Sequence, residues 1–111
     1  MGILNLLLKK KAFDTRLQRA WRSDPNDQVT KSNFGNVYML FTAAGKLFYD
    51  IEEDDKIQRI NLTYWTENDK IITDQPTHPN QEISSYKFES NDILNIEFGG
   101  INARFKRTQN K

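Results

Sequence analysis

The stretch ILNIEFGGINARFKR, residues 93–107, shows most clearly how this 111-residue chain folds. Apolar and polar side chains alternate on both sides of Gly99-Gly100. A period of two is typical of a β-strand with one buried face, and a two-residue glycine turn is typical of a tight hairpin. We therefore expect two antiparallel strands whose inward side chains are Leu94, Ile96, Phe98, Ile101, Ala103 and Phe105.

The same alternation recurs upstream of this hairpin. Runs with a period of two, separated by short turns, cover residues 36–42, 46–52, 57–65, 70–73 and 82–88. A short extended segment that begins at Trp21 brings the total to about eight strands. Such short connections predict an up-and-down antiparallel meander. Because an open meander of this length would leave two exposed edges, we expect it to close into a small barrel.

The segment before the strands has helical spacing. Over residues 3–20, leucines recur near one face of a helix and basic residues lie on the others, with no proline or internal glycine between them. We predict an N-terminal amphipathic helix (residues 1–19) packed on a barrel (residues 20–107), followed by a frayed tail (residues 108–111). Alternatively, this helix binds a membrane surface or a protein partner. A further helical turn fits the residues just before Phe34-Gly35.

Composition excludes several classes of function. The chain has no cysteine, which excludes disulfides and cysteine-based metal or catalytic sites and is compatible with the cytosol. Its apolar N-terminal run is too short to cross a bilayer, and its lysines follow that run, whereas those of a secretory signal precede it. The net charge of +1 is far from that of a typical nucleic-acid binder. We expect a cytoplasmic protein with no transmembrane segment and no nucleic-acid partner.

Residues at the two ends of the strand-rich region resemble a known family. Trp21 stands on the first short strand, and Phe105-Lys106-Arg107 ends the last one. Over residues 20–107 the chain resembles the lipocalin-like (calycin) β-barrels, and more narrowly it is similar to small uncharacterised bacterial lipocalin-like proteins with a TDQP corner. Arg19 stands where the family usually has a glycine, two residues before the tryptophan.

The resemblance implies a fold and a closing contact, and it brings no established activity. The fold is all-β and mainly antiparallel: a small up-and-down lipocalin-like barrel of about eight strands, with an N-terminal helix. The contact is a basic side chain, Arg107 or else Arg104, that packs over the Trp21 ring and helps to close one end of the barrel. Physically this is a cation–π interaction worth about 1 kcal/mol.

The segment TDQPTHPNQE, residues 73–82, is the first candidate site. Its two prolines cannot donate ladder hydrogen bonds, and each pushes the residue before it into an extended conformation. This predicts a stiff corner at the barrel rim. Loops on a rigid scaffold often carry function, so the corner is also a candidate for ligand or partner contacts through Asp74, Gln75, His78 and Glu82.

The barrel interior is the second candidate site. Several aromatic side chains have the spacing to point inward, namely Tyr49, Tyr64, Tyr86, Phe88 and Phe98. An eight-stranded barrel is just wide enough either to pack solid or to hold one small ligand. Two interpretations stay open, a filled core and a pocket for an apolar ligand.

Other chemistry has less support in the sequence. His78 with Asp74 and Glu82 matches no metal-site spacing, and the acidic run at residues 50–55 lacks the glycine and glutamate of a calcium loop. Catalytic motifs are absent, so we expect no metal, no cofactor and no enzyme activity. The main hypothesis is a non-enzymatic binding module that holds a small apolar ligand at one barrel mouth, near residues 74–82. The alternative is a protein-interaction module that uses the N-terminal helix or the barrel surface.

Overall fold

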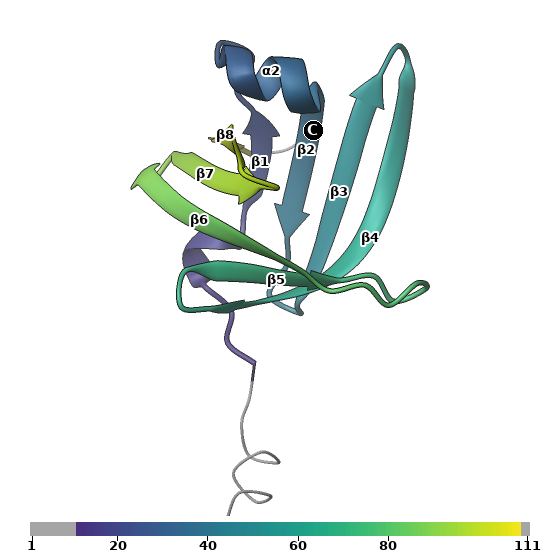
Figure 1. Cartoon of the computed structure of the whole chain (residues 1–111), viewed down its shortest axis with the longest axis vertical. Coiled ribbons are helices and arrows are strands. Elements are labelled where there is room, and N and C mark those ends of the chain that lie inside the picture. Colours follow the sequence, from purple (N-terminus) through teal and green to yellow (C-terminus); the bar gives the residue numbers. More distant parts are fainter. Residues whose placement is uncertain (1–10, 110–111) are drawn as a thin grey trace, which may run out of the picture.

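Eight antiparallel strands close into a barrel in which every strand pairs with its neighbours in the sequence. The computed structural model describes residues 11–109. Strands β2, β3 and β4 stand side by side, and β5, β6 and β7 cross in front of them (Figure 1). The strands are β1 (Ala20–Ser23), β2 (Asn36–Phe41), β3 (Lys46–Glu53), β4 (Lys56–Glu67), β5 (Lys70–Asp74), β6 (Glu82–Ser90), β7 (Ile93–Phe98) and β8 (Ile101–Thr108).

The pairing of β1 with β8 closes the ring and confirms the predicted all-β, up-and-down antiparallel barrel. The alternation that predicted the last hairpin is also correct. Leu94 lies opposite Phe105, Ile96 lies opposite Ala103, and all four side chains are buried. β8 continues to Thr108, the first residue of the predicted frayed tail, and residues 110–111 lie outside the described part of the chain.

The segment before β1 does not form the predicted helix where the structure describes it. Residues 11–19, which we name the strap, hold an isolated β-bridge at Ala12 and a 3₁₀ turn, η1 (Thr15–Leu17). The Thr66 N–H donates to the Ala12 carbonyl at 2.8 Å, and the Asp14 N–H donates to Thr66 Oγ1 at 3.0 Å. These bonds to β4 replace the internal bonds of a helix. Residues 1–10 of the predicted helix lie outside the described residues.

Packing explains why helical spacing was misleading here. Leu17 is completely buried, and the Phe13 ring meets Tyr64 edge-on at a centroid distance of 5.5 Å. Both side chains reach the barrel from a strap that forms no α-helix. Tertiary contacts of this kind routinely override intrinsic helix propensity.

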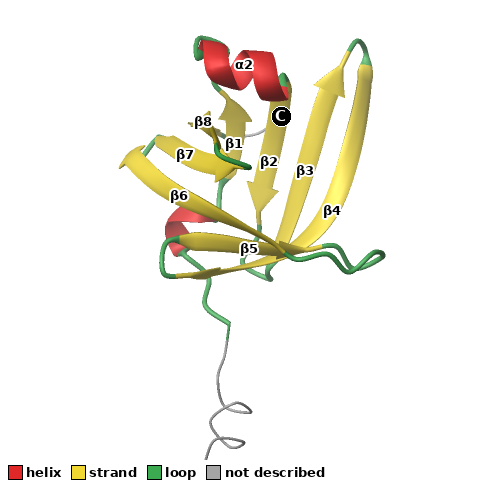
Figure 2. Cartoon of the chain, in the orientation of Figure 1, coloured by secondary structure: helices red, strands yellow, loops and turns green. Residues whose placement is uncertain are grey.

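The helix α2 (Gln28–Phe34) lies at the opposite end of the barrel from the strap (Figure 2). It is the helical turn that was predicted before Phe34. The Asp27 carboxylate caps it by accepting from the Thr30 N–H at 3.2 Å, and Gly35 leaves it with a φ of 69°. The buried Thr30 Oγ1 accepts from the Arg104 N–H of β8 at 2.7 Å, which ties the helix to the barrel.

The barrel therefore has a strap end, crossed by residues 11–19, and a helix end, next to α2 (Figure 1). The β5–β6 loop, residues 75–81, and the tip of the β3–β4 hairpin also belong to the helix end, because β3 and β5 run towards it and β4 and β6 run away from it. No helix within residues 11–109 has the length and hydropathy to span a membrane.

Candidate functional site

The interior of the barrel contains a cavity. A cavity of about 390 Å³ lies between the walls of six strands, and Phe34 at the end of α2 contributes to it. Most of its wall is apolar, formed by Met39, Phe41, Leu47, Tyr49, Ile60, Leu62, Ile71, Ile96 and Phe98. Other hollows, such as one of about 660 Å³ beside Arg19 and Lys106, lie on the outer surface among charged side chains.

The interior beside the strap is packed. There the inward rings of Trp21 and Tyr64 have exposures of 0% and 1%. Towards the helix end, the inward rings of Tyr49 and Phe98 are only partly buried. The sequence left open whether the interior is filled or hollow, and the structure has both: rings packed beside the strap, and a cavity between six strands.

Polar side chains lie on one side of the cavity, on β5, β6 and the loop between them. They are Thr73, Gln75, Asn80, Glu82 and Ser84. The loop is held in place by Asp74, whose Oδ1 accepts from the N–H groups of Gln75 and Asn80, each at 2.9 Å. Asp74 therefore shapes this edge of the cavity without being part of its lining.

The predicted site residues separate into three groups. Tyr49, Gln75 and Glu82 line the cavity. Asp74 supports the loop, and the exposed His78 side chain contacts its own neighbour, with 3.5 Å between His78 Nδ1 and Thr77 Oγ1. The remaining three, Tyr64, Tyr86 and Phe88, belong to the core cluster or pack against it and are not in the lining.

Several lining residues were missed at the sequence level. Thr73 and Ser84 share the inward face with Ile71 and Tyr86, so alternation along β5 and β6 could have identified them. Asn80 and Phe34 had no such signal, because a loop and a helix end bring them to the cavity.

The buried tyrosines differ in what their hydroxyls contact. The Tyr64 hydroxyl donates to the Thr42 carbonyl at 2.8 Å, and burial raises its pKa to about 12, with the Asp14 charge adding to the shift. The Tyr86 hydroxyl donates to Asp14 Oδ2 at 2.7 Å, and burial together with this bond raises its pKa strongly. Both hydroxyls therefore already donate hydrogen bonds to other groups of the protein.

Tyr49 is different because its ring lines the cavity. Burial raises its pKa, so the phenol stays neutral and keeps its proton for a hydrogen bond. Within residues 11–109, no side chain or backbone group forms a hydrogen bond with this hydroxyl. Tyr49 thus offers a donor from the apolar wall of the cavity.

Trp21 and Arg107 lie directly opposite each other in the β1–β8 pairing. The Arg107 guanidinium forms an ion pair with Asp92 at 2.8 Å. At the same end of the barrel, the Arg16 guanidinium stacks 4.3 Å from the centre of the Phe88 ring, and Phe88 contacts Trp21 with 5.9 Å between ring centroids. A basic side chain of the strap thus covers the aromatic cluster beside the indole.

Arg104, the second basic residue that the resemblance implied, takes part in holding α2 and its flanking turn. Its guanidinium donates to Asp24 Oδ2 at 2.5 Å and forms an ion pair with Glu89 at 3.2 Å. Asp24 is buried, with an exposure of 2%.

No cluster of three or more His, Cys, Asp or Glu side chains suited to a metal ion occurs within residues 11–109. In comparisons with protein families, curated proteins and solved structures, no match to this chain is found. Fold and site define its class: a closed eight-stranded antiparallel barrel with an internal cavity.

Proposed function

We propose that this protein is a non-enzymatic binding module that holds a small apolar ligand in the cavity at the helix end. The observation that carries the proposal is the hollow itself: inward side chains of six strands surround a space of about 390 Å³. This volume lies within the range of about 300–1,000 Å³ that is typical of ligand pockets. An apolar wall with a few polar groups on one side is also the usual composition of such pockets.

In this proposal the apolar and the polar lining residues have different roles in binding. The apolar wall removes hydrocarbon from water, which is worth about 25 cal/mol for each Å² buried. Tyr49, Gln75 and Asn80 supply hydrogen bonds that orient one polar group of the ligand. Kinship with the bacterial lipocalin-like barrels and a cytoplasmic location complete the proposal. They rest on the Trp21 and Arg107 resemblance and on the absence of cysteine.

Binding of a neutral aliphatic probe, decanol, to the full chain tests the proposal. We expect saturable binding by calorimetry and an increase in the melting temperature, because a ligand that binds only the folded state stabilises it. A titration with no saturable binding and no thermal shift would contradict the proposed function.

Two neighbouring serines provide a matched pair of variants. Ser84 lines the cavity, whereas Ser85 is the next residue of β6, exposed on the outer face. Ser84→Phe should fill the hollow and weaken decanol binding by at least about tenfold, and Ser85→Phe should leave it unchanged. Circular dichroism checks that both variants keep the sheet. Equal affinity in the two folded variants would place binding outside the cavity.

The alternative, a protein-interaction module, stays a prediction. It depended on an N-terminal helix that is not formed in residues 11–19 and whose first ten positions lie outside the described residues, or on the barrel surface. The two functions differ in one measurable way. Capture of a protein partner should be insensitive to Ser84→Phe, because that side chain faces the interior.

A further inference from the structure

We propose that this cavity distinguishes its ligands by the charge of their polar head, favouring an aliphatic amine over a fatty acid of the same length. The inference rests on the proposed function and adds a ligand class to it. It starts from the charges around the cavity. Among the described residues that line it, Glu82 carries the only charge, and that charge is negative.

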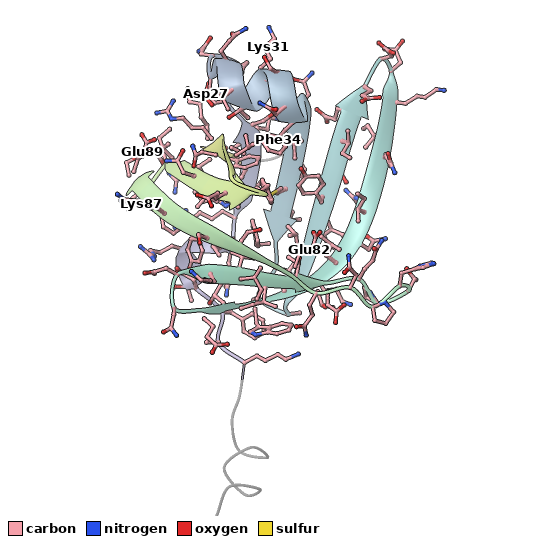
Figure 3. All side chains as sticks on the ribbon, viewed as in Figure 1. Asp27, Lys31, Phe34, Glu82, Lys87 and Glu89 are labelled. Atoms are coloured by element: carbon pink, nitrogen blue, oxygen red, sulfur yellow. The ribbon has the colours of Figure 1, made fainter. Side chains whose placement is uncertain are left out.

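Glu82 lies at the start of β6, on the polar side of the cavity, and Phe34 reaches the cavity from α2 (Figure 3). Within residues 11–109, no basic side chain lies close enough to Glu82 to form an ion pair. The carboxylate is therefore available to a ligand. It is also exposed, so solvent and salt reduce its effect without removing it.

Other groups at this end of the barrel reinforce the negative charge. Asp74 lies beside the polar edge, at the base of the same loop. The β3–β4 hairpin tip, which reaches the helix end, contains Glu53, Asp54 and Asp55 with a single lysine, Lys56, and α2 carries the exposed Lys31. The basic residue Arg22 is already paired with Glu52 at 2.8 Å. Acidic side chains thus outnumber basic ones at this end of the barrel, which favours cations over anions.

The uncharged polar groups are compatible with the same ligand, although they can donate as well as accept and so leave the choice to Glu82. An alkylammonium needs acceptors, and the amide oxygens of Gln75 and Asn80 and the hydroxyl of Ser84 can all accept. A fatty-acid carboxylate would instead place two negative charges at the same polar edge. A neutral alcohol avoids both effects, so its affinity should fall between those of the amine and the acid.

Three probes of equal chain length, decylamine, decanol and decanoate, test the inference at one ionic strength and below their micelle concentrations. We expect the wild-type protein to bind decylamine at least about tenfold more tightly than decanoate, measured by calorimetry. Added salt should reduce that ratio, because it screens exposed charges. Equal affinity for the amine and the acid would overturn the inference.

The variant Glu82→Gln tests the residue itself, because it removes the charge and keeps the shape. We expect it to reduce the amine-to-acid ratio by at least about threefold and to leave decanol binding unchanged. Glu97→Gln is the matched control, because Glu97 is an exposed carboxylate of β7 that is not in the lining. It should keep the wild-type ratio. A ratio that responds equally to both variants, or to neither, would also overturn the inference.

Failure of the inference and failure of the proposed function can be distinguished. If decanol binds, Ser84→Phe weakens that binding as expected, and amine and acid bind equally, the cavity is a ligand site without charge selection. If none of the three probes binds the wild-type protein, the proposed function fails, and the inference fails with it.

Discussion

At the scale of single residues, Asp14 shows how a few side chains close the strap end. Its carboxylate accepts bonds from Arg16 Nη2 at 2.7 Å and from the Tyr86 hydroxyl at 2.7 Å. The bond to Arg16 is the largest cause of its lowered pKa, and the bond to Tyr86 lowers it further, while burial acts in the opposite direction. One short side chain thus connects the strap to β6.

Asp14→Asn should destabilise the protein by about 1–2 kcal/mol at about pH 7, because charge-assisted hydrogen bonds become neutral ones. The folded-state pKa of Asp14 lies below the ordinary aspartate value of 3.8. Its contribution is therefore complete above that value and is lost as the pH falls through the folded-state pKa. Urea denaturation of both proteins at several pH values measures this. A difference between them that stays constant down to about pH 2 would contradict the prediction.

Asp50 lies within β3, as the alternation over residues 46–52 predicted, but its burial had no signal in the sequence. It opens the acidic run at residues 50–55, yet its exposure is 0%. Arg59 on β4 reaches it with two bonds, of 2.8 and 3.0 Å, and its guanidinium also lies over the Phe48 ring. The turn itself begins at Asp54, which has a φ of 45°. Composition alone cannot separate a paired carboxylate in a strand from free ones in the adjacent turn.

At the scale of elements, the secondary structure predicted from local sequence pattern is correct for the strands and wrong for the strap. Alternation and turn residues located seven later strands because each strand has one buried face. The strap has helical spacing, yet its backbone bonds to β4 and its apolar side chains pack into the barrel. The short helix α2 depends in the same way on its contact with β8.

Thr30→Val should destabilise the protein by about 1–3 kcal/mol, because it leaves the Arg104 N–H without its acceptor at nearly constant side-chain volume. The distance from that N–H to Thr30 Oγ1 is 2.7 Å. Chemical denaturation measures the loss, and hydrogen exchange at the Arg104 amide should become faster. Thr30→Ser is the control, since it keeps the hydroxyl. Equal stability of the two variants would show that α2 is held by other contacts.

At the scale of the whole molecule, the decisive feature is that the first and last strands meet. β1 is only four residues long, and it pairs with both β2 and β8. Its largest side chain, Trp21, is completely buried, and the indole N–H donates to the Leu17 carbonyl at 3.1 Å. The ring therefore connects the strap, the β1–β8 pairing and the packed core.

Trp21→Ala should lower the free energy of unfolding by about 3–5 kcal/mol, since it leaves a large cavity in the packed core. Guanidinium denaturation followed by circular dichroism measures the change. Ile57→Ala is the control, because Ile57 has an exposure of 58% and should tolerate truncation with little loss. An unchanged midpoint for Trp21→Ala would contradict the role assigned to this residue in closing the barrel.

The candidate site was only partly predictable. Tyr49, Gln75 and Glu82 were named from the sequence, and they line the cavity. Tyr64, Tyr86 and Phe88 carry the same inward pattern, yet they pack in the core and are not in the lining. Alternation tells which face a side chain occupies, but it says nothing about position along the barrel axis relative to the strap and α2.

The amino-acid sequence by itself determined the strands, their order and their closure, because these follow from local alternation, turn residues and the cost of exposed sheet edges. Only the tertiary structure decided which inward side chains pack together and which line a cavity. That depends on the strap, which brings Leu17 and Phe13 against the barrel core and bonds to Thr66 of β4. These contacts join residues distant in the sequence, so no local pattern records them.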